Sequence, residues 1–151
     1  MMKGMMYMNN IRPYERNVYY YETDKMGVVH HSNYIRIFEE TRIHFLNEAG
    51  MPFEQIEAMG VYMPVLSVEC RYKRPLSFDE PFAVYPKIVK FNGTTLHIEY
   101  KLISRKTGEI CVEGSSSHCF TDLELKPLRT KLHYPDIYKV FSEYNGYEIT
   151  E

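Results

Sequence analysis

The chain has 151 residues, of which 44% are hydrophobic and 25% are charged. This is the size and balance of one globular domain, and it excludes intrinsic disorder for most of the chain. Eighteen Lys and Arg against twenty Asp and Glu leave a net charge of −2, so no global field favours nucleic acid or an anionic membrane surface. No apolar run approaches the roughly 18 residues that a membrane span needs.

The start of the chain and its cysteines indicate a compartment. The sequence MMKGMMYMNN lacks the contiguous apolar stretch and the small-residue cleavage site of a secretory signal. Cys70, Cys111 and Cys119 have no CxxC spacing and are too few for a disulfide framework, which agrees with a reducing environment. We therefore expect a cytoplasmic protein with free thiols and a frayed tail over residues 1–10.

The first predicted elements are a strand and a long helix. Residues 14–21 are rich in β-forming side chains and predict a strand. Over residues 34–49, apolar side chains recur at spacings of three and four, which is typical of an amphipathic helix. Ser32 or Asn33 can cap the start of this helix, and Gly50 supplies its stop.

The rest of the chain predicts a short helix, four strands and a terminal helix. The short helix covers residues 53–59, and the terminal helix covers residues 135–144. Asn92 and Gly93 tolerate the positive φ of a tight turn and predict a hairpin. The four β-like segments are residues 61–73, 81–91, 94–105 and 109–121. Because the breaks between them are short, an antiparallel meander is expected.

Together these elements predict an α+β fold. The expected domain covers residues 11–144, and a C-terminal tail covers residues 145–151. One helix cannot cover both faces of such a sheet, and the outermost strands leave open edges. We therefore expect copies of the chain to associate.

The familiar catalytic signatures are absent. The sequence has no GxSxG elbow, no HExxH, no GxxxxGK[ST] and no GxGxxG before a helix. Ser115, Ser116 and Ser117 lie in a predicted strand, where adjacent side chains face opposite sides, so a nucleophilic pair with His118 is not expected. The same alternation separates His118 from Cys119, and no second ligand pair accompanies them, so we expect no metal site.

The unusual segment is TDKMGVVHHSNY, residues 23–34, between the first strand and the long helix. Asp24 follows the strand, Gly27 permits a tight turn, and the amides of residues 29–33 approach the positive end of the helix. A carboxylate beside such amides can attack a carbonyl or activate water while the amides stabilise an oxyanion. An Asp in this place is also a common turn former, so the residues by themselves leave both roles open.

The stretch VYYYETDKMGVVHHSNYIRIFEETRIHFLNEAG, residues 18–50, resembles the 4-hydroxybenzoyl-CoA thioesterase family. The match is to the branch that includes the acyl-CoA thioesterase of bacterial Tol-Pal operons. The shared pattern is a Tyr-rich strand, a T-D-x-x-G-V-V-x-H segment, and a helix with a central glutamate and arginine. The resemblance implies the hot-dog fold, in which an antiparallel five-stranded sheet wraps one long central helix. It also implies assembly as a homodimer or homotetramer.

The resemblance carries roles to four positions. Asp24 matches the family's catalytic carboxylate, which serves as nucleophile or general base on the thioester. His31 matches the position at the helix entrance whose backbone N–H polarises the thioester carbonyl, and in one branch its imidazole is also implicated. Tyr20 matches a tyrosine that lines the site of that branch, and Gly27 fits the turn.

Some positions depart from the pattern or have a structural alternative. At His30 the branch usually shows an aromatic residue such as tyrosine, and Glu22 stands where Asp is common, so substrate selectivity is expected to differ. His31 could simply cap the helix. Glu39 and Arg42 are three residues apart on the helix, and we interpret them as a surface ion pair.

A coenzyme A substrate carries phosphates, so basic side chains are expected near the mouth of the site. Two clusters are candidates: Arg71, Lys73 and Arg74, and, after the last strand, Lys126, Arg129 and Lys131. Some relatives use basic residues after the last strand for the nucleotide end, so Lys126 and Arg129 are the predicted substrate-binding pair.

The resemblance implies an acyl-CoA thioesterase that hydrolyses its substrate with water and uses no metal or redox cofactor. The same fold also acts on acyl groups carried by acyl carrier protein, a partner whose acidic surface would need a basic patch. A further hypothesis is a hot-dog subunit that binds acyl chains without turnover, with Asp24 as a turn residue.

Overall fold

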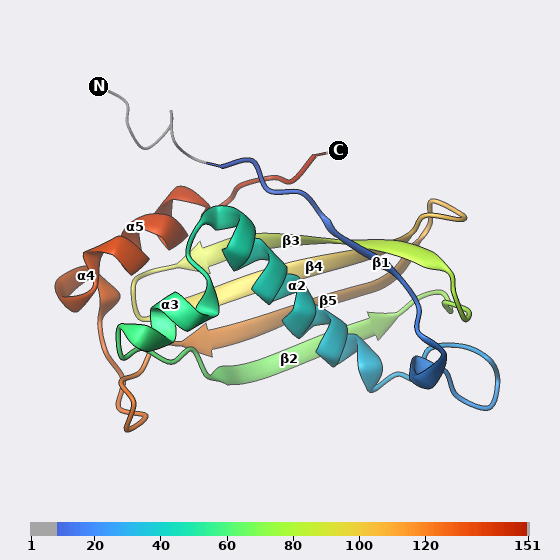
Figure 1. The fold of residues 1–151 in the computed structure, drawn as a ribbon, viewed down its shortest axis with the longest axis horizontal. Coiled ribbons are helices and arrows are strands. Elements are labelled where there is room, and N and C mark those ends of the chain that lie inside the picture. Colours follow the sequence, from blue (N-terminus) through green and yellow to red (C-terminus); the bar gives the residue numbers. More distant parts are fainter. Residues whose placement is uncertain (1–8, 151) are drawn as a thin grey trace.

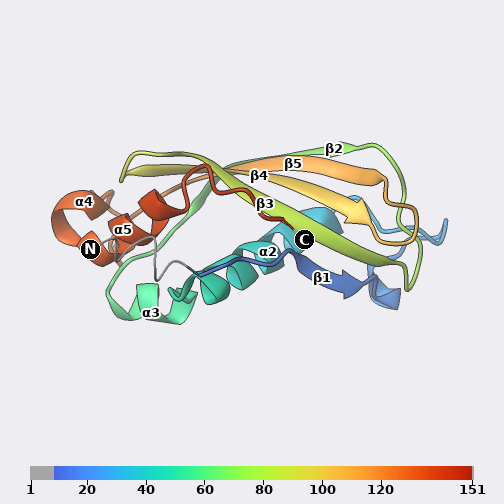
Figure 2. The same ribbon diagram turned by 90° about the horizontal axis from the view of Figure 1, so that it is seen from above.

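The computed structural model describes residues 9–150. Its strands form one antiparallel five-stranded sheet, and a long helix, α2 (Asn33–Ala49), crosses one face of that sheet (Figure 1). Figure 2 shows that α3 (Phe53–Ala58) lies on the same side of the sheet as α2. In spatial order the strands are β1 (Tyr14–Asn17), β3 (Pro81–Phe91), β4 (Thr95–Ser104), β5 (Ile110–Cys119) and β2 (Val65–Tyr72). The predicted hot-dog fold is confirmed.

The amphipathic pattern of α2 forms a buried stripe against the sheet. Its buried positions recur every three or four residues, and Gly50 ends it in the left-handed conformation with φ of 83°. The Phe38 ring stacks on the Tyr100 ring of β4, with centroids 4.3 Å apart. At Gly114 of β5, a Cβ atom would come within 2.4 Å of Phe38. The helix approaches the sheet this closely because Gly114 has no side chain.

Arg42 belongs to the buried stripe of α2. The predicted surface ion pair with Glu39 is wrong, because Arg42 is only 8% exposed and its Nη1 donates to the Tyr100 hydroxyl at 3.1 Å. The stripe includes two adjacent positions, Thr41 and Arg42. A helix that crosses a sheet buries a face wide enough to include such neighbours, which a surface-pair rule does not consider.

A buried chain of hydrogen bonds continues from Arg42 into β5. The Tyr100 hydroxyl lies 2.7 Å from Ser116 Oγ, which lies 2.8 Å from His118 Nε2. A guanidinium can only donate, so Arg42 donates to the Tyr100 hydroxyl. If Tyr100 then donates to Ser116, and Ser116 donates to His118 Nε2, each hydroxyl proton has an acceptor. Burial, with the nearby charge of Arg42, lowers the pKa of His118 to about 4. The imidazole is therefore neutral at pH 7.

The first strand is shorter than the sequence predicts. β1 ends at Asn17, and η1 (Tyr20–Glu22), a turn of 3₁₀ helix, replaces the rest of the expected strand. The Glu22 carboxylate accepts the backbone N–H of Tyr19 at 2.8 Å and two N–H groups of Arg16. These side-chain bonds curl the segment, and strand propensity takes no account of them.

The strand order differs from a simple meander. β3, β4 and β5 follow one another as predicted, with the expected turn at Asn92-Gly93 and a φ of 92° at Gly93. β2 instead pairs with β5 at the other edge. The connection over residues 73–80 is anchored by Leu76, which is fully buried and accepts the backbone N–H of Val29 at 2.9 Å. This long-range burial is invisible in local spacing.

The last part of the chain packs against the sheet. A short helix that the sequence does not predict, α4 (Thr130–His133), precedes α5 (Pro135–Glu143), which confirms the predicted terminal helix. The sequence predicts a tail over residues 145–151, but Ile149 is buried in the core. Most of the predicted N-terminal tail, residues 1–8, lies outside the described residues. None of the helices in the described part of the chain is long and apolar enough to cross a membrane.

Candidate active site

Asp24 sits on a tight turn between η1 and α2. Its N–H donates to the Val28 carbonyl at 2.8 Å, and its carbonyl accepts the N–H of Gly27 at 3.0 Å. Gly27 has a φ of 79°, which favours glycine there. Asp24 Oδ1 accepts the N–H of Met26 at 2.8 Å, while Oδ2 accepts no hydrogen bond from any described residue. The turn therefore orients the carboxylate and leaves one of its oxygens free.

Asp24 borders an open hollow of about 310 Å³ that is lined by three segments of the chain. These are the Asp24 turn, the beginning of α2, and the end of β2 with the connection that follows it. The lining residues are Asp24, Met26, Val28, Val29, His31, Tyr34, Tyr72, Lys73, Arg74 and Pro75. The hollow thus combines a carboxylate, aromatic rings and two basic side chains.

At the entrance of α2, the backbone amide of His31 is unpaired. The N–H of His31 donates to no residue within the described range, whereas the N–H of His30 is bonded to the Glu22 carbonyl at 2.8 Å. The predicted capping by Ser32 or Asn33 is not observed: Ser32 is the N-cap residue, but its hydroxyl pairs with His30 Nδ1 at 2.8 Å. The partial positive charge of the helix terminus therefore stays available at His31.

The aromatic lining comes from residues that the sequence analysis did not single out. The Tyr72 hydroxyl donates to the His31 carbonyl at 3.3 Å, and the Tyr72 and Tyr34 rings lie 5.6 Å apart. Tyr34 is 3% exposed, and burial raises the pKa of its hydroxyl, which stays a donor at neutral pH. Tyr34 fits the helical stripe equally well as a core residue, and Tyr72 arrives from a distant strand, so neither gave a local signal.

The Tyr34 hydroxyl is open to the hollow. It forms no hydrogen bond with any described residue. Among the described residues, only His118 Nδ1 is a fully enclosed polar side-chain atom that lacks a partner. The Tyr34 hydroxyl is therefore not sealed in the core, and it faces the space that Tyr34 lines.

Two basic side chains lie on the rim of the hollow. Lys73 pairs with Glu113 at 2.7 Å, and Arg74 pairs with Glu109 at 3.1 Å, in partly exposed ion pairs. Water screens exposed ion pairs of this kind, so they are weak and an anionic ligand can compete for the two basic side chains. Of the predicted cluster Arg71, Lys73 and Arg74, the last two therefore line this hollow, and Arg71 does not.

Three other predicted residues lie away from the hollow. Tyr20 is 76% exposed, and its ring packs edge-on against Phe78 with centroids 5.6 Å apart, so it does not line the hollow. Lys126 and Arg129 belong to the segment between β5 and α4, at the opposite end of the sheet from the Asp24 turn (Figure 1). His30 is exposed beside the site, where its ring stacks on His31 at 4.2 Å.

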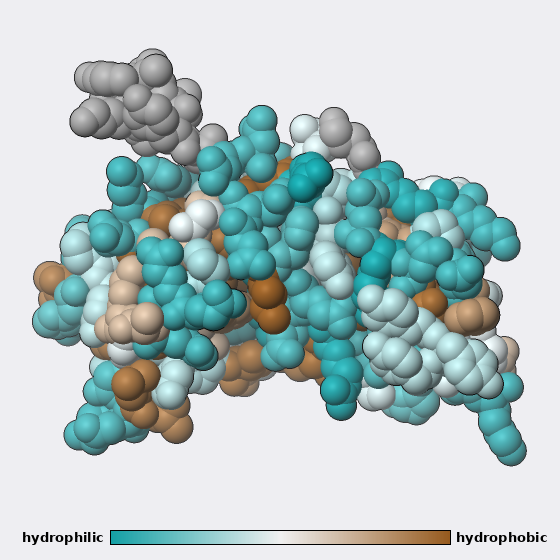
Figure 3. All heavy atoms as spheres, viewed as in Figure 1, coloured by the Kyte–Doolittle hydropathy of each residue, from teal (hydrophilic) through white to brown (hydrophobic). Residues whose placement is uncertain are grey.

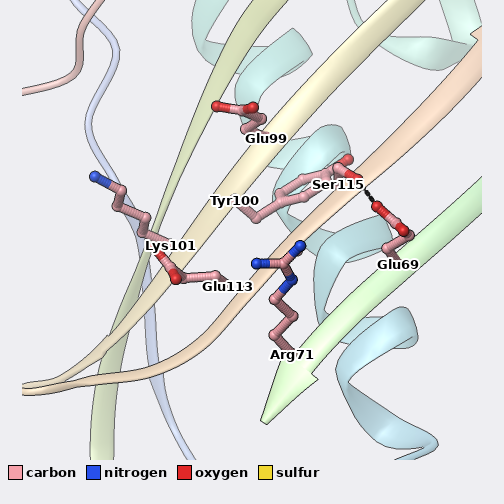
Figure 4. A pocket seen from close by; sticks show the side chains of 8 residues that line it. Glu69, Arg71, Glu99, Tyr100, Lys101, Glu113 and Ser115 are labelled. Carbon is pink, nitrogen blue, oxygen red and sulfur yellow. Dashed lines mark hydrogen bonds between the residues drawn. The ribbon is translucent and has the colours of Figure 1, made fainter. Parts of the chain in front are cut away.

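A second hollow, of about 260 Å³, lies on the outer face of the sheet, away from α2 (Figure 4). Its lining is mainly charged: Glu69, Arg71, Glu99, Tyr100, Lys101, Glu113, Gly114 and Ser115. Ser115 makes only a long hydrogen bond to Glu69, at 3.4 Å, and has no neighbouring base. We interpret this face as solvated charge. The hydrogen-bonded Ser116 and His118 are buried and line neither hollow.

Metal-binding groups are also absent from the described residues. No cluster of three or more His, Cys, Asp or Glu side chains within residues 9–150 could hold a metal ion. Cys70, Cys111 and Cys119 are free thiols.

The hydrophobic surface drawn in Figure 3 gathers along the β2 edge and at the end that carries the β5–α4 connection.

Comparison with known proteins agrees with this geometry. The thioesterase-like superfamily matches residues 18–141. An Aquifex aeolicus protein named "Putative esterase" is 38% identical over 106 residues, which is 70% of this chain and 81% of that protein. A Bacillus subtilis protein named "Putative acyl-CoA thioesterase YneP" is 32% identical over 130 residues, 85% of this chain and 94% of that protein. The crystal structure of a DHNA-CoA thioesterase from Staphylococcus aureus has a TM-score of 0.83 at 28% identity, covering 87% of this chain and 89% of that chain. The chain belongs to the thioesterase-like superfamily.

Proposed function

We propose that the protein is an acyl-CoA thioesterase, which hydrolyses an acyl thioester to a carboxylic acid and free coenzyme A. One observation carries this proposal: Asp24, which has one carboxylate oxygen free of hydrogen bonds to the described residues, and His31, whose N–H is unpaired among them, line the same hollow. The names of the Bacillus subtilis and Staphylococcus aureus relatives support coenzyme A thioesters as the substrate class. Membership in the 4-hydroxybenzoyl-CoA branch and a cytoplasmic location stay predictions.

In the proposed reaction, Asp24 drives attack on the thioester carbonyl. As a general base, the carboxylate takes a proton from water while the water oxygen bonds to the carbonyl carbon. As a nucleophile, it bonds to that carbon itself and forms an anhydride, which water then opens. In either route the C–S bond breaks, and the thiolate leaves and takes a proton. No metal or redox cofactor enters the proposed chemistry.

The amide of His31 would stabilise the charge that develops on the carbonyl oxygen. A helix entrance with free N–H groups suits an oxyanion, and one such donor is typically worth about 10²- to 10³-fold in rate. The Tyr34 hydroxyl offers a further donor at the wall of the hollow. Lys73 and Arg74 would hold phosphates of coenzyme A at the rim.

We also propose that two copies associate along β2. Within residues 9–150 this strand is paired only with β5, so its other edge is open to them. Val65 and Leu66 on β2 are 50% and 59% exposed. Open strand edges with exposed apolar side chains favour pairing with another strand. Because β2 ends at Tyr72, which lines the hollow, a second copy paired along β2 would lie next to the site. Lys126 and Arg129 are at the other end of the sheet, so they could bind the substrate only from such a partner.

The first experiment measures thiol release from short, long and aromatic acyl-CoA esters by the natural protein and by Asp24→Asn. Loss of a catalytic carboxylate is expected to lower turnover by about 10²-fold or more. Asp122→Asn is the matched control, because Asp122 also accepts backbone N–H groups in a turn, at the other end of the sheet. A chelator in the assay is expected to make no difference.

Each other outcome rejects a part of the proposal. Equal activity of Asp24→Asn and the natural protein would remove Asp24 from the mechanism. If thiol is released only from esters of acyl carrier protein, the substrate is an acyl carrier protein thioester and not a coenzyme A thioester. Binding of acyl-CoA without any release would identify a non-catalytic acyl-binding module.

A further inference from the structure

We propose that Glu22 and Arg16 form a positioning pair that sets the separation between Asp24 and the amide of His31. This inference rests on the proposed function, because it assigns these two groups to one reaction. Neither Glu22 nor Arg16 lines the hollow, so both would act through the groups that they hold. Three sets of contacts lead to this conclusion, and the charge state of Glu22 agrees with it.

The Glu22 side chain is buried and fully engaged. It is 4% exposed, and its two oxygens accept Arg16 Nη1 at 2.8 Å and Arg16 Nη2 at 2.7 Å. Oε1 also accepts the backbone N–H of Tyr19 at 2.8 Å. A two-pronged pair of this kind fixes the orientation of both planes as well as their distance. Glu22 therefore has one allowed place relative to Arg16.

The backbone of Glu22 holds the entrance of α2. Its carbonyl accepts the N–H of His30 at 2.8 Å and the side-chain amide of Asn33 at 2.9 Å. His30 directly precedes His31, and Asn33 is the first residue of α2. Asp24 follows Glu22 by two residues. Glu22 is thus linked to both parts of the candidate site: to Asp24 through the chain, and to the entrance of α2 through hydrogen bonds.

Arg16 ties Glu22 to the rigid part of the fold. Arg16 Nε donates to Glu40 of α2 at 2.9 Å, and Nη1 also donates to the Asn17 carbonyl at 2.9 Å. The guanidinium carbon lies 4.2 Å from the centroid of the Tyr19 ring and 5.1 Å from that of Phe82 on β3. Strand, helix and turn are therefore joined at a single buried cation.

The charge state of Glu22 supports this geometry. Burial by itself would raise the pKa of Glu22, but the hydrogen bonds from Arg16 and from the Tyr19 amide outweigh it and hold the pKa below its usual range. The carboxylate is therefore ionised at neutral pH. A buried ion pair contributes little net stability compared with apolar packing, whereas catalytic groups need placement to within about 0.5 Å. The pair is better explained by placement than by stability.

Glu22→Gln tests the proposal, because the amide keeps the shape of the side chain and breaks the two-pronged pair. We expect kcat on the best acyl-CoA ester to fall at least about 10-fold, with KM within about 2-fold, since Glu22 does not touch the hollow. Glu22→Asp, which keeps the charge, is expected to recover part of that loss. The control is Glu48→Gln, because Glu48 accepts Arg12 through both oxygens and a backbone N–H, at the far end of α2.

Thermal unfolding and hydrogen exchange separate positioning from simple destabilisation. Glu22→Gln is expected to lower Tm more than Glu48→Gln, because Arg16 and Glu22 are buried whereas Arg12 is exposed. kcat is therefore measured well below the Tm of either variant. Only Glu22→Gln should speed exchange of the His30 amide, which is bonded to the Glu22 carbonyl. Unchanged kcat in Glu22→Gln, or an equal loss in Glu48→Gln, would overturn the inference. The exchange measurement needs no substrate, so it tests the positioning pair separately from the proposed function. If the natural protein turns over no ester, the proposed function fails. If the His30 amide exchanges as slowly in Glu22→Gln as in the natural protein, the positioning pair is rejected.

Discussion

The carboxylate of Asp24 keeps one oxygen free because the turn uses only the other, through the N–H of Met26. Glu22, two residues earlier, has both oxygens bonded to Arg16 and lies in the interior. Two carboxylates close together in sequence therefore receive different tasks from their surroundings. The free one can meet a substrate, and the bonded one can only hold its neighbours in place.

His118 provides a test of the buried polar chain through the pH dependence of stability. Its pKa is lowered to about 4 from a usual value of 6.5, because burial and Arg42 disfavour the charged ring. Between these values the unfolded chain binds a proton that the folded protein does not, so stability is complete above pH 6.5 and falls as the pH is lowered towards 4. A shift of this size corresponds to a loss of about 3 kcal/mol.

The measurement is urea unfolding of the natural protein and of His118→Asn at several values between pH 7.5 and pH 4.5. The variant lacks the titrating ring, so its stability disadvantage should shrink as the pH falls, and all other acid effects cancel in the comparison. A disadvantage that stays constant over this range would contradict the assignment of His118 as a neutral buried imidazole.

At the scale of elements, the contact between α2 and β5 depends on one position without a side chain. Gly114 has Phe38 on one side, and a Cβ atom there would also lie 2.7 Å from the backbone carbonyl oxygen of Glu69 on β2. The Phe38 ring could turn aside, but it stacks on Tyr100 at 4.3 Å, and a backbone oxygen cannot rotate away. Helix, ring stack and two strands are therefore matched in shape.

Gly114→Ala is accordingly expected to destabilise the fold by about 1–3 kcal/mol through overpacking. The change adds one methyl group and removes no hydrogen bond, so equilibrium unfolding in urea reports the packing term directly. A loss below about 0.5 kcal/mol would show that α2 can move away from the sheet at little cost.

At the scale of the whole molecule, the hollow is lined by segments that lie far apart in the sequence. The Asp24 turn and the entrance of α2 supply Asp24 and His31, and the end of β2 and the connection after it supply Tyr72, Lys73 and Arg74. β2 is at the same time an open edge of the sheet. Assembly and activity are therefore expected to be linked through this strand.

The proposed dimer predicts a mass in solution of twice the chain mass of 18.0 kDa. Leu66→Glu places a charge on the open edge and is expected to shift the protein towards the monomer in light scattering at equal concentration. Leu132→Glu is the control, because Leu132 is 63% exposed, compared with 59% for Leu66, but lies on α4. A monomeric natural protein, or an equal effect of both variants, would reject β2 as the interface.

Much of the fold follows from patterns between neighbouring residues. The stripe of α2, the alternation in β4 and the turn at Asn92-Gly93 were all predictable, because helix period, strand period and turn conformation depend on the nearest residues. The same holds for the Asp24 turn, where Gly27 supplies the positive φ. Asp24, Gly27 and His31 were placed together for this reason.

The sequence by itself thus determined the fold class, the long helix and the turn that carries Asp24. Only the tertiary structure decided that β2 lies beside β5 and that Arg42 is buried. It also decided which basic residues reach the hollow: Lys73 and Arg74 do, beside Tyr72, whereas the segment of Lys126 and Arg129 lies at the other end of the sheet. These outcomes depend on which surfaces the whole chain can bury together. Burial and hydrogen bonding between distant segments are properties of the packed molecule, and local spacing does not encode them.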